Sequence, residues 1–509
     1  MNDLLINFLR ETSQTNHWFV LLPEIALALL AISMLGLDLF KKSPNAPSNP
    51  ASRLNTRISI IGQIGIFIAI SCFGSAFYEE NRVLFGGLLE QSEKTQFMRC
   101  FFVFASISIT LLSDRYLGKF KLPKAEYLHL SLLVCAGFML LVQSAHFILF
   151  FVVLEMVTVA FYVLVAFQRT HLLSLEAGLK YLTLGALSST ILLFGIVLLY
   201  GIAGNPEMAG FVQDGFQFKE LQQFISLHPE NLIVRLGALL VISGICFKIG
   251  AVPFQIWVPD VYQGAPTPTT AYLATASKAA GIFILIQLLQ GPFLALSAFL
   301  IPFLSVICAV TILYGNIAAT GQTNIKRLIG LSGISHAGYL LLGVIAAISV
   351  PFAFDAVLFY LTVYMVSSIL AFGTITYLGQ VEESTIELRD FNGLLHRSPF
   401  LGSLGLISLG SLAGIPPLGG FIGKLLLFWV AYQAGLFFLL AVAIIGVVIS
   451  IYYYFGWLRA IVLRPEGEEL VEYPLDSSPL LLSERCFFIS LLTLVVILGL
   501  FPGLLLNLI

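Results

Sequence analysis

Apolar runs long enough to cross a lipid bilayer recur along almost the whole of this chain. A helix needs about 20 mostly apolar residues to span the hydrocarbon layer, and we count fourteen such runs in the 509 residues. They predict an all-α polytopic membrane protein with about 14 transmembrane helices. The expected spans are 18–40, 57–78, 97–113, 126–144, 146–168, 174–200, 233–258, 267–290, 293–318, 325–349, 352–379, 398–432, 436–461 and 483–505.

The composition is also typical of an integral membrane protein. The chain is 58% hydrophobic and 11% charged, whereas soluble domains carry about 25% charged residues. The net charge of −2 predicts no nucleic-acid partner. The six cysteines stand singly, without a CxxC or His/Cys pattern. We therefore expect neither a disulfide framework nor an iron–sulfur or other metal site in this chain.

The basic residues predict an orientation. Sixteen lysines and arginines follow odd-numbered spans, and six lie beside loops of the opposite side. The positive-inside rule then places both termini on the periplasmic or equivalent side. The first seventeen residues lack the basic start and the small-residue cleavage site of a signal peptide. We expect membrane insertion to begin with the first span.

The stretch 247–281 contains the features least expected in hydrocarbon. Lys248 and Lys278 lie in otherwise apolar sequence, and the residues between them include Pro253, Pro259, Pro266 and Pro268. Proline interrupts or ends helices. Unwound backbone at membrane depth is tolerated only where protein or a water-filled cavity satisfies it. This stretch is therefore a candidate ion path.

A second interrupted span lies at 398–432, where Pro416 and Pro417 precede Lys424. Interrupted spans at corresponding places in two halves are typical of inverted-repeat transporters. The predicted organisation has helix breaks in spans 7 and 12 and four parts. These are N-terminal helices 1–3 (1–125), a first five-helix repeat (126–290), a second, inverted repeat (291–465), and a C-terminal loop with helix 14 (466–509).

Several ionisable residues inside spans are candidates for proton transfer. A lysine at the bilayer centre costs about 2.5–3.5 kcal/mol, which favours a functional reason for each one. Glu155 lies in span five without a countercharge in its own helix, although a carboxyl group hydrogen-bonded between helices is the plainer alternative. Glu176 and Lys180 are spaced i, i+4, so this can be a purely structural pair.

A histidine and two tyrosines complete the set of candidates. His336 lies in a polar strip with serines, where it can be a relay member or a satisfied core histidine. Tyr360 and Tyr364, one turn apart, could hold water near a path, but such pairs more often belong to a core. Motifs for nucleotide or haem binding are absent from the sequence.

Four segments resemble a known family. They are 154–189, 247–281, 324–339 and 414–429, which contain LEMVTVAF, FKIGAVPF, NIKRLIGLSGISHAGY and GIPPLGGFIGKLLLFW. They are similar to the antiporter-like membrane subunits of proton-pumping NADH:quinone oxidoreductase, or respiratory complex I. The resemblance covers roughly residues 20–505 and is greatest to subunit N, called subunit 2 in mitochondria and chloroplasts, because of Lys180 and Lys424.

The resemblance implies roles for the candidate residues. Glu155 and Lys248 would form the regulating pair of a first half-channel, with Lys180 near its mouth. Lys278 would be the central connection, His336 part of the linking hydrated axis, and Lys424 the terminal residue of the second half-channel. The chain would then be a proton-translocating subunit that couples quinone reduction in other subunits to proton transfer. It would perform no redox catalysis itself.

The same resemblance implies partners, cofactors and location. Antiporter-like neighbours and a small subunit K-like protein would surround this chain in the bilayer. Flavin, iron–sulfur clusters and quinone would belong to other subunits. A bacterial inner membrane is the expected location, with thylakoid and mitochondrial inner membranes as alternatives. Two other functions stay open: a subunit of a multisubunit sodium/proton antiporter, and a scaffold subunit that conducts no protons.

Overall fold

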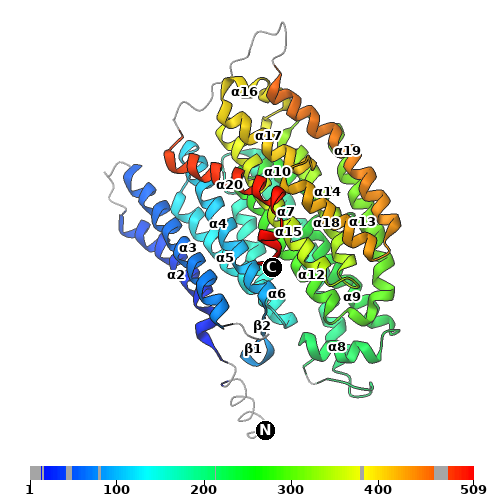
Figure 1. Ribbon diagram of the computed structural model, residues 1–509. Coiled ribbons are helices and arrows are strands. Elements are labelled where there is room, and N and C mark those ends of the chain that lie inside the picture. The colour runs from blue at the N-terminus through cyan, green and yellow to red at the C-terminus, as the bar shows by residue number, and fades with distance from the viewer. Residues whose placement is uncertain are drawn as a thin grey trace. The chain divides into compact units, whose positions relative to one another are not determined.

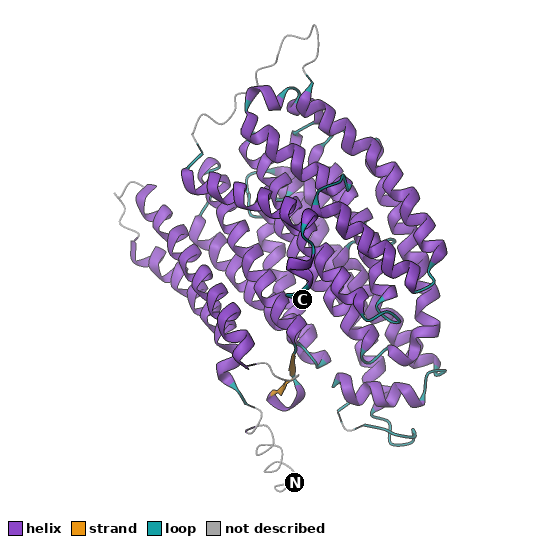
Figure 2. Ribbon diagram, viewed as in Figure 1, coloured by secondary structure: helices purple, strands orange, loops and turns teal. Residues whose placement is uncertain are grey.

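The computed structural model describes residue 13 and residues 16–41, 49–77, 82–212, 214–378, 383–463 and 480–509. These parts are almost entirely helical, as Figure 2 shows. The described strands are β1 (Arg82–Leu84) and β2 (Leu89–Gln91), which form a short antiparallel hairpin. The expected all-α class is confirmed.

The helices follow one another with short connections. In chain order they are η1 (Trp18–Leu21), α2 (Leu22–Lys41), α3 (Asn49–Phe77), η2 (Phe85–Gly87), α4 (Glu93–Lys119), α5 (Lys124–Gln143), α6 (Phe147–Val165), α7 (Leu172–Ala203), α8 (Phe218–Leu227), α9 (Leu232–Ile249), α10 (Trp257–Gly264), α11 (Thr267–Tyr272), the π-helical turn η3 (Leu273–Ser277), α12 (Lys278–Gln290), η4 (Leu294–Leu296), α13 (Ser297–Thr320), α14 (Ile325–Ala346), α15 (Phe352–Tyr377), η5 (Glu383–Thr385), η6 (Leu388–Phe391), α16 (Leu394–Arg397), α17 (Pro399–Ala413), α18 (Gly419–Gln433), α19 (Phe437–Val462), α20 (Leu482–Leu500) and α21 (Gly503–Leu506).

Within the described residues, 12 helices are long and apolar enough to cross a membrane. They coincide with twelve of the expected spans. The other two expected spans, 57–78 and 398–432, overlap the shorter apolar segments Asn55–Ser71 and Pro399–Ala413. The chain is therefore a polytopic membrane protein. The total of fourteen spans, the inverted repeats and the four-part division stay predictions.

The chain forms two compact units. The first comprises Met1–Leu164, Gly185–Ile245 and Phe283–Ser297. In it, α2, α3, α4 and α5 pack side by side, as Figure 1 shows. The helices α6, α8 and the C-terminal part of α7 belong to the same unit.

The second unit comprises Val165–Leu184, Cys246–Ile282 and Ala298–Ile509. Its centre is built by α14 and α15, which pack against each other. The helices α17, α18 and α20 pack against α15, while α18 and α19 also contact α14. Every residue of the long helix α14 except Arg327 is buried, so its other polar side chains are enclosed by protein.

Helix α4 differs from the sequence expectation. We expected a short span at 97–113 and counted Arg99 among the residues beside loops, but the helix runs from Glu93 to Lys119. A capping box formed by Ser92 and Thr95 begins the helix. Arg99 is buried inside it and forms an ion pair with Glu24. The Glu24 carboxylate compensates the charge of the Arg99 guanidinium. The helix can therefore bury Arg99, a residue that hydropathy alone would place near the end of a span.

Some expectations fall on residues outside the described ranges. Most of the first seventeen residues, the side chain of Cys72 and the loop 464–479 are among them. The five other cysteines are free thiols. The polar segment 201–232 contains the ten-residue helix α8.

Candidate functional site

The first helix break follows Lys248. Helix α9 ends at Ile249, Gly250 has a φ of +74°, and α10 begins only at Trp257. Protein groups satisfy the backbone around the break: Val252 donates to Thr311 Oγ1 at 3.0 Å, and Trp257 Nε1 donates to the Phe247 carbonyl at 3.1 Å. The expected proline, Pro253, lies in the unwound segment. Lys248 is buried in the last turn of α9.

The second break separates α17 from α18. Helix α17 ends at Ala413, Gly414 has a φ of +88°, and Pro416 and Pro417 precede α18 at Gly419. A glycine reaches this left-handed conformation without the steric cost that a Cβ brings. The break leaves carbonyl groups at the end of α17 without helical partners. A side chain from α18 uses them.

That side chain is Lys424. Its Nζ donates to the carbonyl oxygens of Leu412 at 2.9 Å and Ala413 at 2.8 Å. The C-terminal end of a helix carries a partial negative charge, so the two acceptors favour an ammonium group at this position. Lys424 is buried, and its Nζ also lies 5.6 Å from the centroid of the Tyr339 ring.

Lys278 is held in a similar way. It is the first residue of α12 and follows the π-helical turn η3. Its Nζ donates to the Gly333 carbonyl at 2.5 Å and lies 5.2 Å from the centroid of the Tyr364 ring. Within the described part of the chain, neither Lys278 nor Lys424 forms an ion pair with a carboxylate. Both ammonium groups are held by main-chain oxygen and aromatic faces.

His336 lies between these two lysines in a cluster of tyrosines. Its Nδ1 is 2.6 Å from the Tyr360 hydroxyl, and its Nε2 is 3.1 Å from the Tyr454 hydroxyl. The Tyr364 ring centroid is 4.9 Å from that of His336, and the Tyr339 ring centroid is 6.0 Å away. His336 is a buried side chain with a hydrogen-bond partner at each ring nitrogen.

The second unit thus brings three of the predicted residues into one row. Tyr364 contacts both Lys278 and His336, while Tyr339 contacts both His336 and Lys424. Tyr339 and Tyr454 were not among the residues that the sequence suggested. Tyr454 stands in the apolar run Tyr452–Tyr454 of α19, 118 positions from its histidine partner, so the sequence carries only a weak signal for this contact.

Lys180 belongs to a separate charged cluster. Its Nζ lies 2.7 Å from Glu176, as the i, i+4 spacing predicts, and 2.6 Å from Asp260. Asp260 also pairs with Arg327 at 2.6 Å. Burial would raise the pKa of Asp260, but hydrogen bonds from Lys180 and Arg327 outweigh that effect and hold its pKa below the usual value.

Sequence reasoning did not select Asp260 as a candidate. A signal was present, because Asp260 is the one carboxylate between Lys248 and Lys278 in the sequence. Lys326, beside Arg327 in the first turn of α14, is buried and donates to the Ala265 carbonyl at 2.6 Å. It therefore also holds the broken segment in place.

Glu155 lies in the first unit, on α6. It accepts a hydrogen bond of 2.5 Å from Ser189 of α7. This contact is the interhelical hydrogen bond that we considered as the plainer alternative. Glu155 belongs to the first unit and Lys248 to the second, so their pairing stays a prediction.

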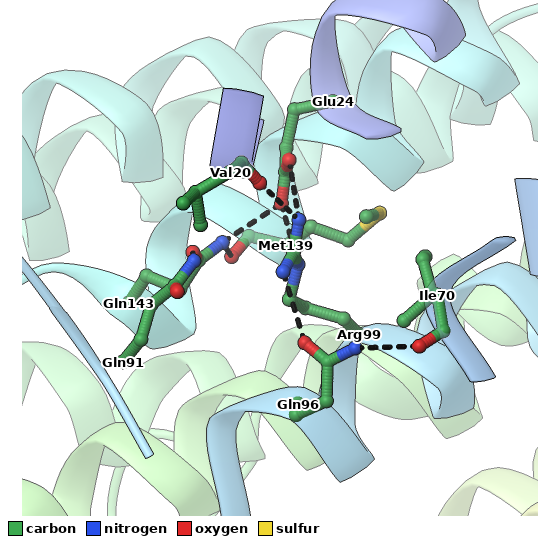
Figure 3. A network of polar contacts seen from close by, with 8 residues as sticks. All are labelled: Val20, Glu24, Ile70, Gln91, Gln96, Arg99, Met139 and Gln143. Carbon is green, nitrogen blue, oxygen red and sulfur yellow. Dashed lines mark hydrogen bonds and ion pairs between the residues drawn. The ribbon is translucent and has the colours of Figure 1, made fainter. Parts of the chain in front are cut away.

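A further polar network joins the N-terminal helices of the first unit. Arg99 donates through Nε and Nη2 to the two oxygens of Glu24, each at 2.8 Å, as Figure 3 shows. Gln143 donates to the same carboxylate at 2.8 Å, and Gln96 accepts from Arg99 at 2.9 Å. The Glu24 carboxylate therefore has its countercharge and its hydrogen-bond donors within this bundle.

The described residues contain no group of three or more His, Cys, Asp or Glu side chains placed to hold a metal ion. The polar groups of the row in the second unit are lysine, histidine and tyrosine. These groups can accept or donate protons, so the chemistry of the row is suited to proton transfer. The row contains no carboxylate pair suited to hydrolytic chemistry.

Comparison with known proteins identifies the family to which this chain belongs. A family model described as the membrane domain of NADH:quinone oxidoreductase and Mrp antiporter proteins matches residues 144–450. NADH-quinone oxidoreductase subunit N 1 of Opitutus terrae is 51% identical over 452 residues, which are 89% of this chain and 88% of that protein. The chain belongs to the subunit N family of NADH-quinone oxidoreductase. The resemblance in its four segments is therefore confirmed.

Solved structures agree with membership of the subunit N family. A chain of respiratory complex I from Thermus thermophilus with bound aureothin matches with a TM-score of 0.76 and 27% identity, covering 96% of this chain and 99% of that chain. A chain of the Mrp complex from Dietzia matches with a TM-score of 0.73 and 21% identity over 95% and 96% of the two chains. The latter likeness shows a shared fold alone.

Proposed function

We propose that this chain moves protons across the membrane as a subunit of a quinone-reducing complex. The observation that supports this most is the buried row from Lys278 through His336 to Lys424 in a member of the subunit N family. A buried lysine without a carboxylate partner can take up and release a proton, because its charged form is not fixed by an ion pair.

The energy for this transport has to come from elsewhere in the complex. Moving one charge against 100 mV needs about 2.3 kcal/mol, and the chain has no redox group in our proposal. Flavin, iron–sulfur clusters and quinone would be held by other subunits. A change in the Glu155–Lys248 interaction, imposed by a neighbour, would set the charge of Lys248 and so start proton transfer toward Lys278.

The partners in this proposal are other membrane subunits of the complex. They would include antiporter-like neighbours and a small subunit K-like protein, in a bacterial inner membrane, with both termini on the periplasmic side. The finding that supports this location is the match of nearly the whole chain to a complex I chain from Thermus thermophilus.

The decisive experiment is Lys248→Met in the assembled complex. We expect proton translocation per electron to fall, because the first half-channel then has no group to load. Lys219→Met is a matched control, because Lys219 is 62% exposed and lies outside the spans. Unchanged pumping in Lys248→Met would remove the basis of the proposal.

A second candidate function is a subunit of a sodium/proton antiporter without redox drive. The match to the Mrp complex fold and the name of the family model favour keeping it. Sodium-dependent proton uptake into vesicles that hold the chain and its partners, in the absence of an electron donor, would support this alternative. A scaffold role instead predicts that Lys424→Met disturbs assembly alone.

A further inference from the structure

Two adjacent serines of α7 contact two different helices of the first unit. Ser189 Oγ donates to Glu155 Oε1 of α6 at 2.5 Å. Ser188 Oγ donates to the Gly244 carbonyl of α9 at 3.3 Å. Neighbouring residues of a helix point about 100° apart, since one turn takes 3.6 residues. One helix can therefore contact α6 with one serine and α9 with the other.

The two serines differ from the other hydroxyl residues of this helix. Thr183 Oγ1 donates to the Leu179 carbonyl at 3.0 Å, and Thr190 Oγ1 donates to the Ala186 carbonyl at 2.9 Å. Both threonines are exposed, and such bonds to the preceding turn are the local choice for a hydroxyl in a helix. The serines are buried and bond to neighbouring helices instead. Their contacts are therefore set by tertiary packing.

Close packing fixes the Ser188 face of α7 against α9. A Cβ at Gly195 would lie 2.8 Å from the Gly237 carbonyl oxygen. A Cβ at Gly244 would lie 2.5 Å from Leu192 Cβ. Leu192 and Gly195 follow Ser188 by four and seven positions, so they share its face of the helix. Small residues let membrane helices approach each other this closely.

This face of α7 leads to Lys248. Gly244 lies one helical turn before Lys248 on α9. Ser188 therefore contacts the main chain of the turn that leads to this lysine, while Ser189 contacts the carboxylate that the proposed function pairs with it. Helix α7 is thus connected to both members of the predicted Glu155–Lys248 pair.

From these contacts we propose that Ser189 is a positioning residue that holds the Glu155 carboxylate at α7 and so regulates its pairing with Lys248. The inference rests on the proposed function, in which that pairing changes. A hydroxyl and an ammonium group are both donors to a carboxylate, so they compete for it. With the Ser189 hydrogen bond in place, the carboxylate is held at α7. When that bond breaks, the carboxylate is released to the ammonium group.

The test is Ser189→Ala in the assembled complex, measured as the initial rate of proton translocation into sealed vesicles. Without the hydroxyl, the carboxylate stays with the Lys248 ammonium group, which favours its charged form and slows release of the proton. We expect the rate to fall about tenfold, as the loss of one hydrogen bond to a charged group predicts. Electron transfer to a water-soluble acceptor checks that the redox subunits are still assembled.

Two further variants separate the hydroxyl from a general disturbance of α7. Ser189→Thr keeps a hydroxyl at this position and should pump like the wild type. Thr190→Ala is the matched control, because it removes the next hydroxyl of the helix, which is exposed and bonds within α7. It should also pump normally. A loss in either variant equal to that in Ser189→Ala would overturn the positioning role.

Lys248→Met separates a failure of this inference from a failure of the proposed function. If Lys248→Met lowers pumping while Ser189→Ala pumps like the wild type, the positioning role is wrong and the proposed function stands. If neither variant lowers pumping, the proposed function fails and the positioning role with it.

Discussion

At the scale of single residues, the chain holds its charged groups in two different ways. Asp260 lies between the spanning helices, with a side chain 32% exposed, and pairs with Lys180 and Arg327. Lys278 and Lys424 are buried and bind main-chain carbonyls. The first arrangement is a network of fixed opposite charges, while the second leaves the lysines without a fixed countercharge.

The Asp260 network predicts a pH-dependent contribution to stability. Its pKa is lowered in the folded chain, so the stabilisation is present above the unfolded pKa of about 3.9 and is lost as the pH falls through the folded value. Exposed pairs contribute at most about 1 kcal/mol each. We expect Asp260→Asn to lower the thermal midpoint of the detergent-purified chain slightly at pH 6.

The difference between wild type and Asp260→Asn should shrink as the pH is lowered below about 4. Asp260 of the unfolded chain binds a proton there first, and the folded chain follows at its lower pKa. Thermal unfolding followed by tryptophan fluorescence across this pH range measures it. A difference that grows toward low pH would contradict the assignment of Asp260 as a carboxylate stabilised by its neighbours.

At the same scale, the sequence identified most of the ionisable groups but not their partners. Lysines in apolar runs stand out because the insertion cost of each is large, so Lys248, Lys278 and Lys424 could be named. Tyr454 could not, because its contact with His336 joins positions 118 residues apart and tyrosine is common in helix packing. Long-range pairing is decided by tertiary packing and has no local signature.

At the scale of helices, the breaks were predictable and the lengths less so. Prolines in two of the apolar runs indicated interruptions, and the helix breaks contain Pro253 and the pair Pro416 and Pro417. Proline alone does not decide a break, since Pro302 lies inside the continuous helix α13.

Helix α4 was underestimated at both ends, since the expected span 97–113 lies inside Glu93–Lys119. Glu24, which compensates the charge of Arg99, lies 75 positions away in the sequence. A hydropathy count uses only neighbouring residues and therefore cannot include this pairing.

The break at Gly414 predicts a specific sensitivity. Gly414→Ala places a Cβ in the left-handed region, at about 1–2 kcal/mol, and also 3.1 Å from Lys424 Cδ. We expect lower thermal stability and reduced pumping. Gly435→Ala is the control, because Gly435 also has a positive φ, +72°, but nothing within 4 Å of the added Cβ. It should lose stability alone and keep its pumping.

The Glu24–Arg99 network predicts a coupling between α2 and α4. Removal of one partner leaves an uncompensated buried charge and costs about 3–5 kcal/mol. We therefore expect Glu24→Gln and Arg99→Gln each to destabilise the chain strongly, and the double variant to be less destabilised than the sum of the two. Thermal unfolding of all four proteins in a double-mutant cycle measures this coupling.

The same cycle has a functional control. Complexes that still assemble with Arg99→Gln should pump protons with an unchanged ratio to electrons, because Arg99 makes none of the contacts of the row in the second unit. A lowered ratio in well-assembled complexes would mean that the network takes part in transport.

At the scale of the whole molecule, the proposed function predicts which subunits accompany the chain and how the chain is oriented in the membrane. We expect the tagged chain, purified in mild detergent, to carry iron–sulfur signals and quinone reductase activity from its partners. Small hydrophobic partners without redox centres would instead favour the antiporter alternative. The measurement is electron paramagnetic resonance together with identification of the co-purified subunits.

Orientation has its own test. A reporter that is active only outside the cytoplasm, fused after Ile509, should be active, and the same reporter in the loop at 321–324 should be inactive. The positive-inside rule is the reason, because Lys326 and Arg327 follow that loop directly. The reverse pattern would invert the predicted topology.

Because the buried lysines bind main-chain acceptors, side-chain mutagenesis cannot remove those acceptors. Lys424 is held by the carbonyls of Leu412 and Ala413, Lys278 by that of Gly333 and Lys326 by that of Ala265. No codon change deletes a peptide oxygen. A saturation screen for defective pumping can therefore identify the lysines directly, whereas substitutions at residues 412 and 413 change buried side chains and leave the acceptor oxygens in place. Only backbone chemistry, such as an ester in place of the amide, would alter these oxygens.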